Sequence, residues 1–125
     1  TQDILVERMV LKGVGASIGS VPPHLNVNCV RNVLFRHISM PQTMKGIYVK
    51  SNPECLADGS STGLIQNITY EDVDIIRPKW WSIWIGPQQQ HEPGSGLGLR
   101  CPLDYPLRKP CPTQGCVNIS DITLR

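Results

Sequence analysis

Four segments of the chain repeat one pattern, and this repeat constrains the fold more than any other feature of the sequence. The copies begin at Asp3, Asn32, Asn67 and Asp121. Each copy starts with Asn or Asp, and apolar residues occupy its second, fourth, seventh and ninth places as far as it extends. A period of tens of residues in short β-rich units is typical of a stacked array and not of an ordinary globular core.

The charge at the fifth place of the repeat alternates from one copy to the next. It reads Glu7, Arg36, Glu71 and Arg125. Opposite charges that lie side by side on neighbouring strands attract, whereas like charges repel. The alternation therefore favours a stack in which the copies follow one another in sequence order.

A second, shorter segment repeats in step with the first, at residues 15–20, 46–51 and 82–87. Each unit therefore carries at least two short strands, which bury an apolar face only when coils lie above and below them. We expect an all-β, right-handed parallel β-helix of about four coils, with the handedness taken from the usual rule for parallel crossovers. Strict alternation places Ile47, Val49, Ile83 and Ile85 inward, and Tyr48, Lys50 and Trp84 outward.

Length and charge narrow the possible classes of protein. The 125 residues suffice for one domain, and we expect residues 1–125 to form part of a single β-helix domain. A net charge of +2 without Lys/Arg clusters does not favour a nucleic-acid partner. No apolar run reaches the roughly 18 residues of a membrane span. The sequence begins and ends inside a strand pattern, so we expect the remainder of a longer chain, or a protein partner, to cover the open coil ends.

The five cysteines predict disulfides and not a metal site. Zinc sites show paired cysteines or histidine partners at short spacing, which this sequence lacks, and we expect no metal and no cofactor. Cys29 is expected to be unpaired and buried. The disulfide candidates are Cys55, Cys101, Cys111 and Cys116, of which the last three fall in a Pro/Cys-rich insertion at about 88–117.

Two N-glycosylation sequons begin at Asn67 and Asn118. Sequons and disulfides both belong to oxidising, extracellular compartments. We therefore expect a secreted or cell-surface glycoprotein.

Three segments, taken in order, resemble motifs of one enzyme family. Residues 13–20 read Gly-Val-Gly-Ala-Ser-Ile-Gly-Ser and resemble the Gly-His-Gly-Ile-Ser-Ile-Gly-Ser motif of polygalacturonases, glycoside hydrolase family 28. Residues 46–51 resemble that family's Gly-Val-Arg-Ile-Lys-Thr motif, and residues 66–73 are similar to the strand that follows it. The resemblance implies a right-handed parallel β-helix that hydrolyses α-1,4 galacturonosyl linkages, or a rhamnose-containing pectin backbone, with inversion.

The sequence also departs from the pattern of that family. The resemblance implies catalytic carboxylates from Asn-Thr-Asp and Gly-Asp-Asp motifs, which do not occur here, so the catalytic aspartates are expected upstream and no catalytic residue is assigned within the chain. Val14 stands at the position of the family's catalytic histidine. Tyr48 replaces a substrate-binding arginine, which removes a bidentate clamp for a carboxylate. Lys50 is retained and is expected to bind substrate.

The outward residues of the second repeated segment form the candidate binding face. Tyr48 and Trp84 occupy the same place on successive coils, so their rings are expected to form a strip that stacks on sugar rings, with Lys50 beside it. The same strip could instead stabilise the solenoid without a ligand, and the sequence does not decide between these. Three further residues could line the rim of the groove: Trp81, Gln88 and His91.

Two functions of different classes follow. The first is a polygalacturonase-type hydrolase acting on pectic or other acidic polysaccharide. The second, motivated by Val14, is a non-catalytic glycan-binding or structural extracellular β-helix. A calcium-dependent polysaccharide lyase is less favoured because no acidic cluster is visible in the sequence.

Overall fold

The computed structural model describes residues 1–22, 28–51, 63–87 and 117–125. Within these ranges the chain forms strands and no helix. Almost all of the predicted insertion, residues 88–116, lies outside the described residues. The strands are β1 (Gln2–Val10), β2 (Ala16–Val21), β3 (Cys29–Pro41), β4 (Ile47–Ser51), β5 (Leu64–Ile76), β6 (Ile83–Pro87) and β7 (Asn118–Leu124).

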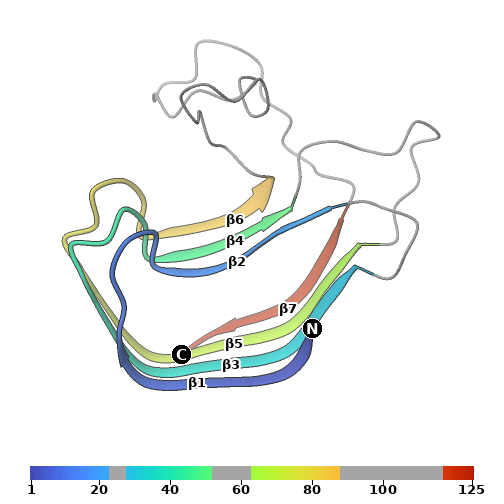
Figure 1. Ribbon diagram of the computed structural model, residues 1–125, viewed down its shortest axis with the longest axis horizontal. Coiled ribbons are helices and arrows are strands. Elements are labelled where there is room, and N and C mark those ends of the chain that lie inside the picture. The colour runs from blue at the N-terminus through green and yellow to red at the C-terminus, as the bar shows by residue number, and fades with distance from the viewer. Residues whose placement is uncertain (23–27, 52–62, 88–116) are drawn as a thin grey trace, which may run out of the picture.

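The strands form two parallel sheets, which Figure 1 shows facing one another and joined by turns along one side. One sheet has the order β1-β3-β5-β7 and the other the order β2-β4-β6. The register follows the sequence repeat, since Ile4 pairs with Val33, Val33 with Ile68, and Ile68 with Ile122. The predicted parallel β-helix is confirmed, with each repeat of the sequence forming one coil.

Left-handed residues bend the long strands and explain the spacing of the apolar places. The Asn or Asp that opens each copy has a positive φ, between 54° and 57°. The sixth place is also left-handed, at Arg8, His37 and Asp72. Such a residue interrupts the extended backbone, so the alternation of side chains restarts after it. Inward residues therefore fall at places two and four, and again at seven and nine.

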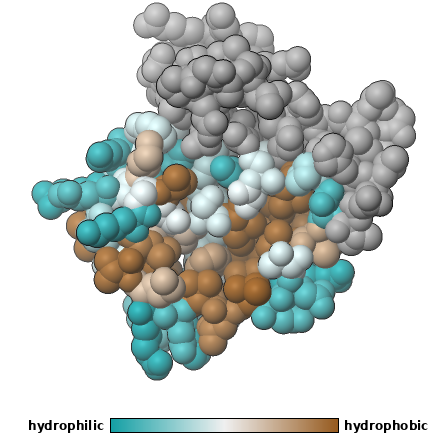
Figure 2. Space-filling model, viewed as in Figure 1, coloured by the Kyte–Doolittle hydropathy of each residue, from teal (hydrophilic) through white to brown (hydrophobic). Residues whose placement is uncertain are grey.

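The core lies between the two sheets and is best filled in the middle coils. Phe35 on β3 and Tyr70 on β5 stack almost parallel, with ring centroids 4.9 Å apart. Apolar residues at the two ends of the stack stay exposed, and Figure 2 shows hydrophobic residues gathered over the face seen there. The buried apolar residues include Ile18, Val33, Ile38, Met40, Ile47, Val49, Ile65 and Ile68.

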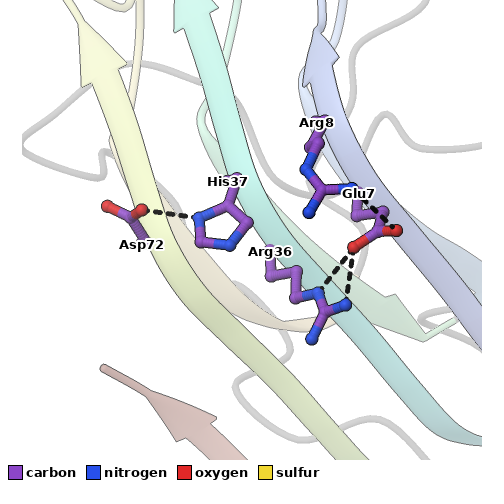
Figure 3. Close-up of polar contacts among 5 residues, drawn as sticks. All are labelled: Glu7, Arg8, Arg36, His37 and Asp72. Carbon is purple, nitrogen blue, oxygen red and sulfur yellow. Dashed lines mark hydrogen bonds and ion pairs between the residues drawn. The ribbon is translucent and has the colours of Figure 1, made fainter.

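Charged side chains on the outer face join neighbouring coils, as Figure 3 shows. Nε and Nη2 of Arg36 both lie 2.7 Å from Oε2 of Glu7. Arg125 Nε lies 3.6 Å from Glu71 Oε2, so alternation at the fifth place produces the predicted attraction between coils. The hydrogen bond from Arg36, with the nearby positive charges, lowers the pKa of Glu7 despite an opposing effect of desolvation.

Two residues that alternation places inward are not buried. Ile83 is 45% exposed and Ile85 is 42% exposed, although their neighbours on β4, Ile47 and Val49, are buried. The reason is that β6 is the edge strand of its sheet, with a partner on one side only within the described residues. The prediction for Cys29 holds in part, because its thiol is free but half-buried.

Candidate functional site

The turns before β2, β4 and β6 stack on one another and bring the motif segments to one corner of the coil. Met44 N donates to the carbonyl oxygen of Gly13 at 2.7 Å. In the next coil, Lys79 N donates to Thr43 O and Trp80 N donates to Met44 O, both at 2.9 Å. Residues far apart in sequence therefore form one continuous corner.

Two glycines make this close stacking possible. A Cβ atom at Gly15, which has a φ of 97°, would collide with the carbonyl oxygens of Lys45 and Gly46. A Cβ at Gly46 would collide with the carbonyl oxygen of Ser82 in the following coil. The glycines of the first two motifs therefore permit coil-to-coil contact of the backbone.

Strand pairing aligns three outward residues, Ser17 on β2, Tyr48 on β4 and Trp84 on β6. Tyr48 does not belong to the core cluster that includes Ile47 and Val49, as expected for an outward residue. The expectation of an exposed Tyr48 ring is nevertheless wrong, because its side chain is 0% exposed. The ring is covered by lysine side chains, which sequence reasoning did not anticipate.

Lys45, in the turn before β4, is the principal functional candidate that the sequence analysis missed. It is only 1% exposed. Its Nζ lies 3.5 Å from the centroid of the Tyr48 ring, 5.5 Å from that of Trp80 and 6.0 Å from that of Trp81. Within the part of the chain that the structure describes, this ammonium has no hydrogen-bond acceptor. Burial, assisted by the positive charge of Lys50, lowers the pKa of Lys45 to about 8.

Lys50 approaches the same tyrosine ring from β4. Its Nζ lies 4.7 Å from the Tyr48 centroid, so two ammonium groups share one aromatic ring. Each gains a cation–π attraction, while their like charges repel. The expected placement of Lys50 beside Tyr48 agrees with the structure, and the lysine is half-buried.

The tryptophans continue the aromatic surface along the corner. The rings of Trp81 and Trp84 contact one another with centroids 5.6 Å apart and planes tilted by 52°. Both are half-buried, whereas Trp80 is exposed. The structure thus brings Trp81 and Trp84 together, and Trp84 adjoins Tyr48 through strand pairing. The described site combines two cations with indole and phenol rings.

The remaining sequence candidates fall in three groups. Val14 lies exposed in the turn before β2, where its methyl groups can neither donate nor accept a hydrogen bond. Asn67 and Asn118 are exposed, and Asn67 Nδ2 donates to Asn32 Oδ1 at 3.0 Å. The others lie outside the described residues: Gln88, His91, Cys55, Cys101, Cys111 and Cys116.

The described residues contain neither a group of side chains that could hold a metal ion nor a helix that could span a membrane. No group of three or more His, Cys, Asp or Glu side chains in residues 1–22, 28–51, 63–87 and 117–125 is placed to hold a metal ion. The same ranges contain no helix long and apolar enough to cross a membrane.

A signal for Lys45 was present in the sequence. Each of the three stacked turns carries a lysine, at Lys12, Lys45 and Lys79. These positions are not adjacent in the chain and do not belong to a strand pattern, so only the stacking of the turns shows that they share one corner.

Comparison with known proteins agrees with this architecture. The family model described as glycosyl hydrolases family 28 matches residues 1–125. Polygalacturonase 2 of Penicillium olsonii is 32% identical over 112 residues, which cover 90% of this chain and 24% of that relative. The chain thus spans about a quarter of the length of the curated relative it matches. No solved structure gave a significant match. The sequence motifs, the coil register and the match of the family model to residues 1–125 agree. The chain belongs to glycosyl hydrolases family 28.

Proposed function

We propose that this chain is part of a polygalacturonase-type glycoside hydrolase that acts on pectic polysaccharide. The observation that carries the proposal is the family match over residues 1–125. The corner built by the motif segments supports it, because aromatic rings and ammonium groups suit a polymer of acidic sugars.

Inverting hydrolysis needs one carboxylic acid to protonate the leaving oxygen and one carboxylate to activate water. The Asn-Thr-Asp and Gly-Asp-Asp motifs are not in this sequence, so segments outside it would supply these groups. In this proposal the half-buried Lys50 binds a substrate carboxylate and Trp84 stacks on a sugar ring, with Trp81 behind it. Tyr48, being fully buried, supports Lys50 instead of stacking on substrate.

The direct test is an assay of the full natural protein on polygalacturonate, with the anomer of the first product followed by NMR. We expect reducing ends to appear with inverted configuration. Lys50→Met should lower kcat/KM about tenfold to a hundredfold, as expected for the loss of a charge-assisted hydrogen bond. Arg8→Met, which removes a well-exposed cation from β1, is the control and should leave kcat/KM unchanged. Absence of hydrolysis on all pectic substrates would contradict the proposal.

A second candidate is a glycan-binding protein without catalytic activity, and Val14 is the observation that favours it. Valine cannot hydrogen-bond a catalytic carboxylate or tune its pKa, as the family's histidine would. This alternative predicts binding of pectic oligosaccharides that is lost in Trp84→Ala, with no bond cleavage at any pH. Restoring hydrolysis by Val14→His would favour it further.

We also propose that the full protein is secreted, glycosylated at Asn67 and Asn118, and cross-linked among Cys55, Cys101, Cys111 and Cys116. The exposure of both asparagines is compatible with modification. Mass spectrometry of the natural protein, before and after enzymatic deglycosylation and with and without reduction, tests each part. Unmodified asparagines and four free thiols at these cysteines would contradict it.

A further inference from the structure

The three stacked turns form a cationic corner. Residues 11–15, 42–46 and 77–82 contain Lys12, Lys45, Arg77 and Lys79 and not one aspartate or glutamate. Backbone hydrogen bonds hold these turns against one another. Among these cationic residues, Lys45 has an enclosed ammonium that feels a second positive charge, that of Lys50.

Lys45 is the least expected member of this corner. An ammonium removed from water without a hydrogen-bond acceptor is strongly destabilising before compensation. Cation–π contact with Tyr48 and the more distant Trp80 and Trp81 offsets part of this cost. A methionine would fill such an apolar surrounding without the penalty, so stability alone does not account for a lysine here.

We propose that Lys45, enclosed against the Tyr48 ring, is a positioning residue that adds a second positive charge to the carboxylate site proposed at Lys50. Lys50 is half-buried and contacts the carboxylate, whereas the enclosed Lys45 is a positioning residue that supplies a second positive charge. This inference rests on the proposed function. It assigns to Lys45 the second positive charge that β4 lacks with tyrosine at position 48.

The proposal predicts that affinity for the acidic sugar depends on pH. An anion binds best while Lys45 is protonated, so affinity falls as the pH rises through the pKa of Lys45, which is about 8. Lys50 and Tyr48, both on β4, face its ammonium. The adjoining turns carry Lys12, Arg77 and Lys79. Since the neighbours are cations and a phenol, no nearby carboxylate in these turns masks the effect.

The test uses the full natural protein and calorimetric titration between about pH 6.5 and about pH 9, a range that brackets the pKa of Lys45. One ligand is a sulfur-linked trigalacturonide that resists hydrolysis, and the other is its carboxyl-reduced, uncharged counterpart. Lys45→Met removes the charge, Lys45→Arg makes it permanent, and Lys79→Met removes an exposed charge from the neighbouring turn as the control. Thermal unfolding of each variant checks the fold.

We expect Lys45→Met to bind the acidic ligand about tenfold more weakly without loss of thermal stability, and to bind the reduced ligand as the natural protein does. Lys45→Arg should keep the affinity but lose its fall above about pH 8. Lys79→Met should retain both, because exposed charges are screened by salt. If the natural protein binds the acidic ligand but Lys45→Met retains its affinity and pH dependence, the role of Lys45 is refuted while the proposed function stands. If neither ligand binds, both are refuted.

Discussion

Asparagine and aspartate at the corners show how single residues set the path of the chain. Asn32 has a φ of 55°, a left-handed conformation that asparagine tolerates better than most residues. Its Nδ2 donates to Asp3 Oδ1 at 2.8 Å, and its Oδ1 accepts from Asn67 Nδ2 at 3.0 Å. The side chain thus serves both the bend within a coil and the bond between coils.

Substitutions at Asn32 should separate these two contributions. Asn32→Gly keeps the backbone conformation but loses both side-chain hydrogen bonds, and we expect it to lower the free energy of unfolding by about 1 kcal/mol. Asn32→Ala adds left-handed strain and should cost about 2–3 kcal/mol. Urea denaturation of the two variants measures the difference. Equal losses would show that the left-handed backbone at this corner contributes nothing.

The position of a strand in the stack decides how deeply its inward residues are buried. Ile4 and Ile68 hold the same place, yet Ile4 on β1 is 39% exposed and Ile68 on β5 is 0% exposed. The four-stranded sheet has the order β1-β3-β5-β7, so β1 is an edge strand and β5 an inner one. Equivalent residues therefore bury different amounts of apolar surface.

The same substitution in the two strands should give different losses of stability. Ile68→Ala is expected to lower the free energy of unfolding by about 3–4 kcal/mol, because it leaves a cavity in a packed core. Ile4→Ala is the matched control and should cost less than about 1 kcal/mol. Chemical denaturation measures both. A loss at Ile4 as large as that at Ile68 would contradict the burial difference.

The ion pair between β1 and β3 should make stability depend on pH. The pKa of Glu7 is lowered from its usual value of 4.5, chiefly by the hydrogen bond from Arg36. The contribution is therefore complete above pH 4.5 and is lost as the pH falls through the lower pKa of the folded state. We expect Glu7→Gln to be less stable than the natural chain near neutral pH, with the difference vanishing in acid. Thermal unfolding of both proteins across this pH range measures the difference. A difference in stability that does not change with pH would contradict a contribution from the ion pair.

At the scale of the whole molecule, the ends of the stack differ from its sides. Ile4 and Met9 on β1 and Leu124 on β7 hold inward places of the repeat and are nevertheless exposed. Within the described residues each of these strands pairs on one side only, and such sheet edges are sites for pairing with further strands. That more of the natural chain, or a partner, covers these ends stays a prediction, which this exposure motivates.

A polypeptide of residues 1–125 made by itself should associate through its open edges. We expect Val10→Lys to reduce the association, because a charged residue on an edge strand opposes pairing with another chain. Sedimentation velocity at increasing concentration tests this. Arg8→Gln, at an exposed outer corner of the same strand, is the control. A chain that stays monomeric at all concentrations would show that the exposed edges do not drive association.

The order of the coils and the inward places of the long strands could be predicted from the amino-acid sequence alone. The repeat states these directly, because each coil must present the same pattern to the next. The motif segments of the sequence also indicated the family. Ile83 and Ile85 are exposed although alternation places them inward, because burial depends on whether another coil lies beyond the strand.

The side chains that meet at the candidate site could be recognised only from the folded coils. Tyr48 aligns with the outward residues as alternation requires, yet it is buried, and Nζ of both Lys45 and Lys50 lies over its ring. Lys45 belongs to a turn, where no periodic pattern fixes a side chain. Its surroundings come from Tyr48 in its own coil and Trp80 and Trp81 in the next. A repeat in the sequence specifies how coils stack, but contacts between unlike residues at a turn arise only once the coils have stacked.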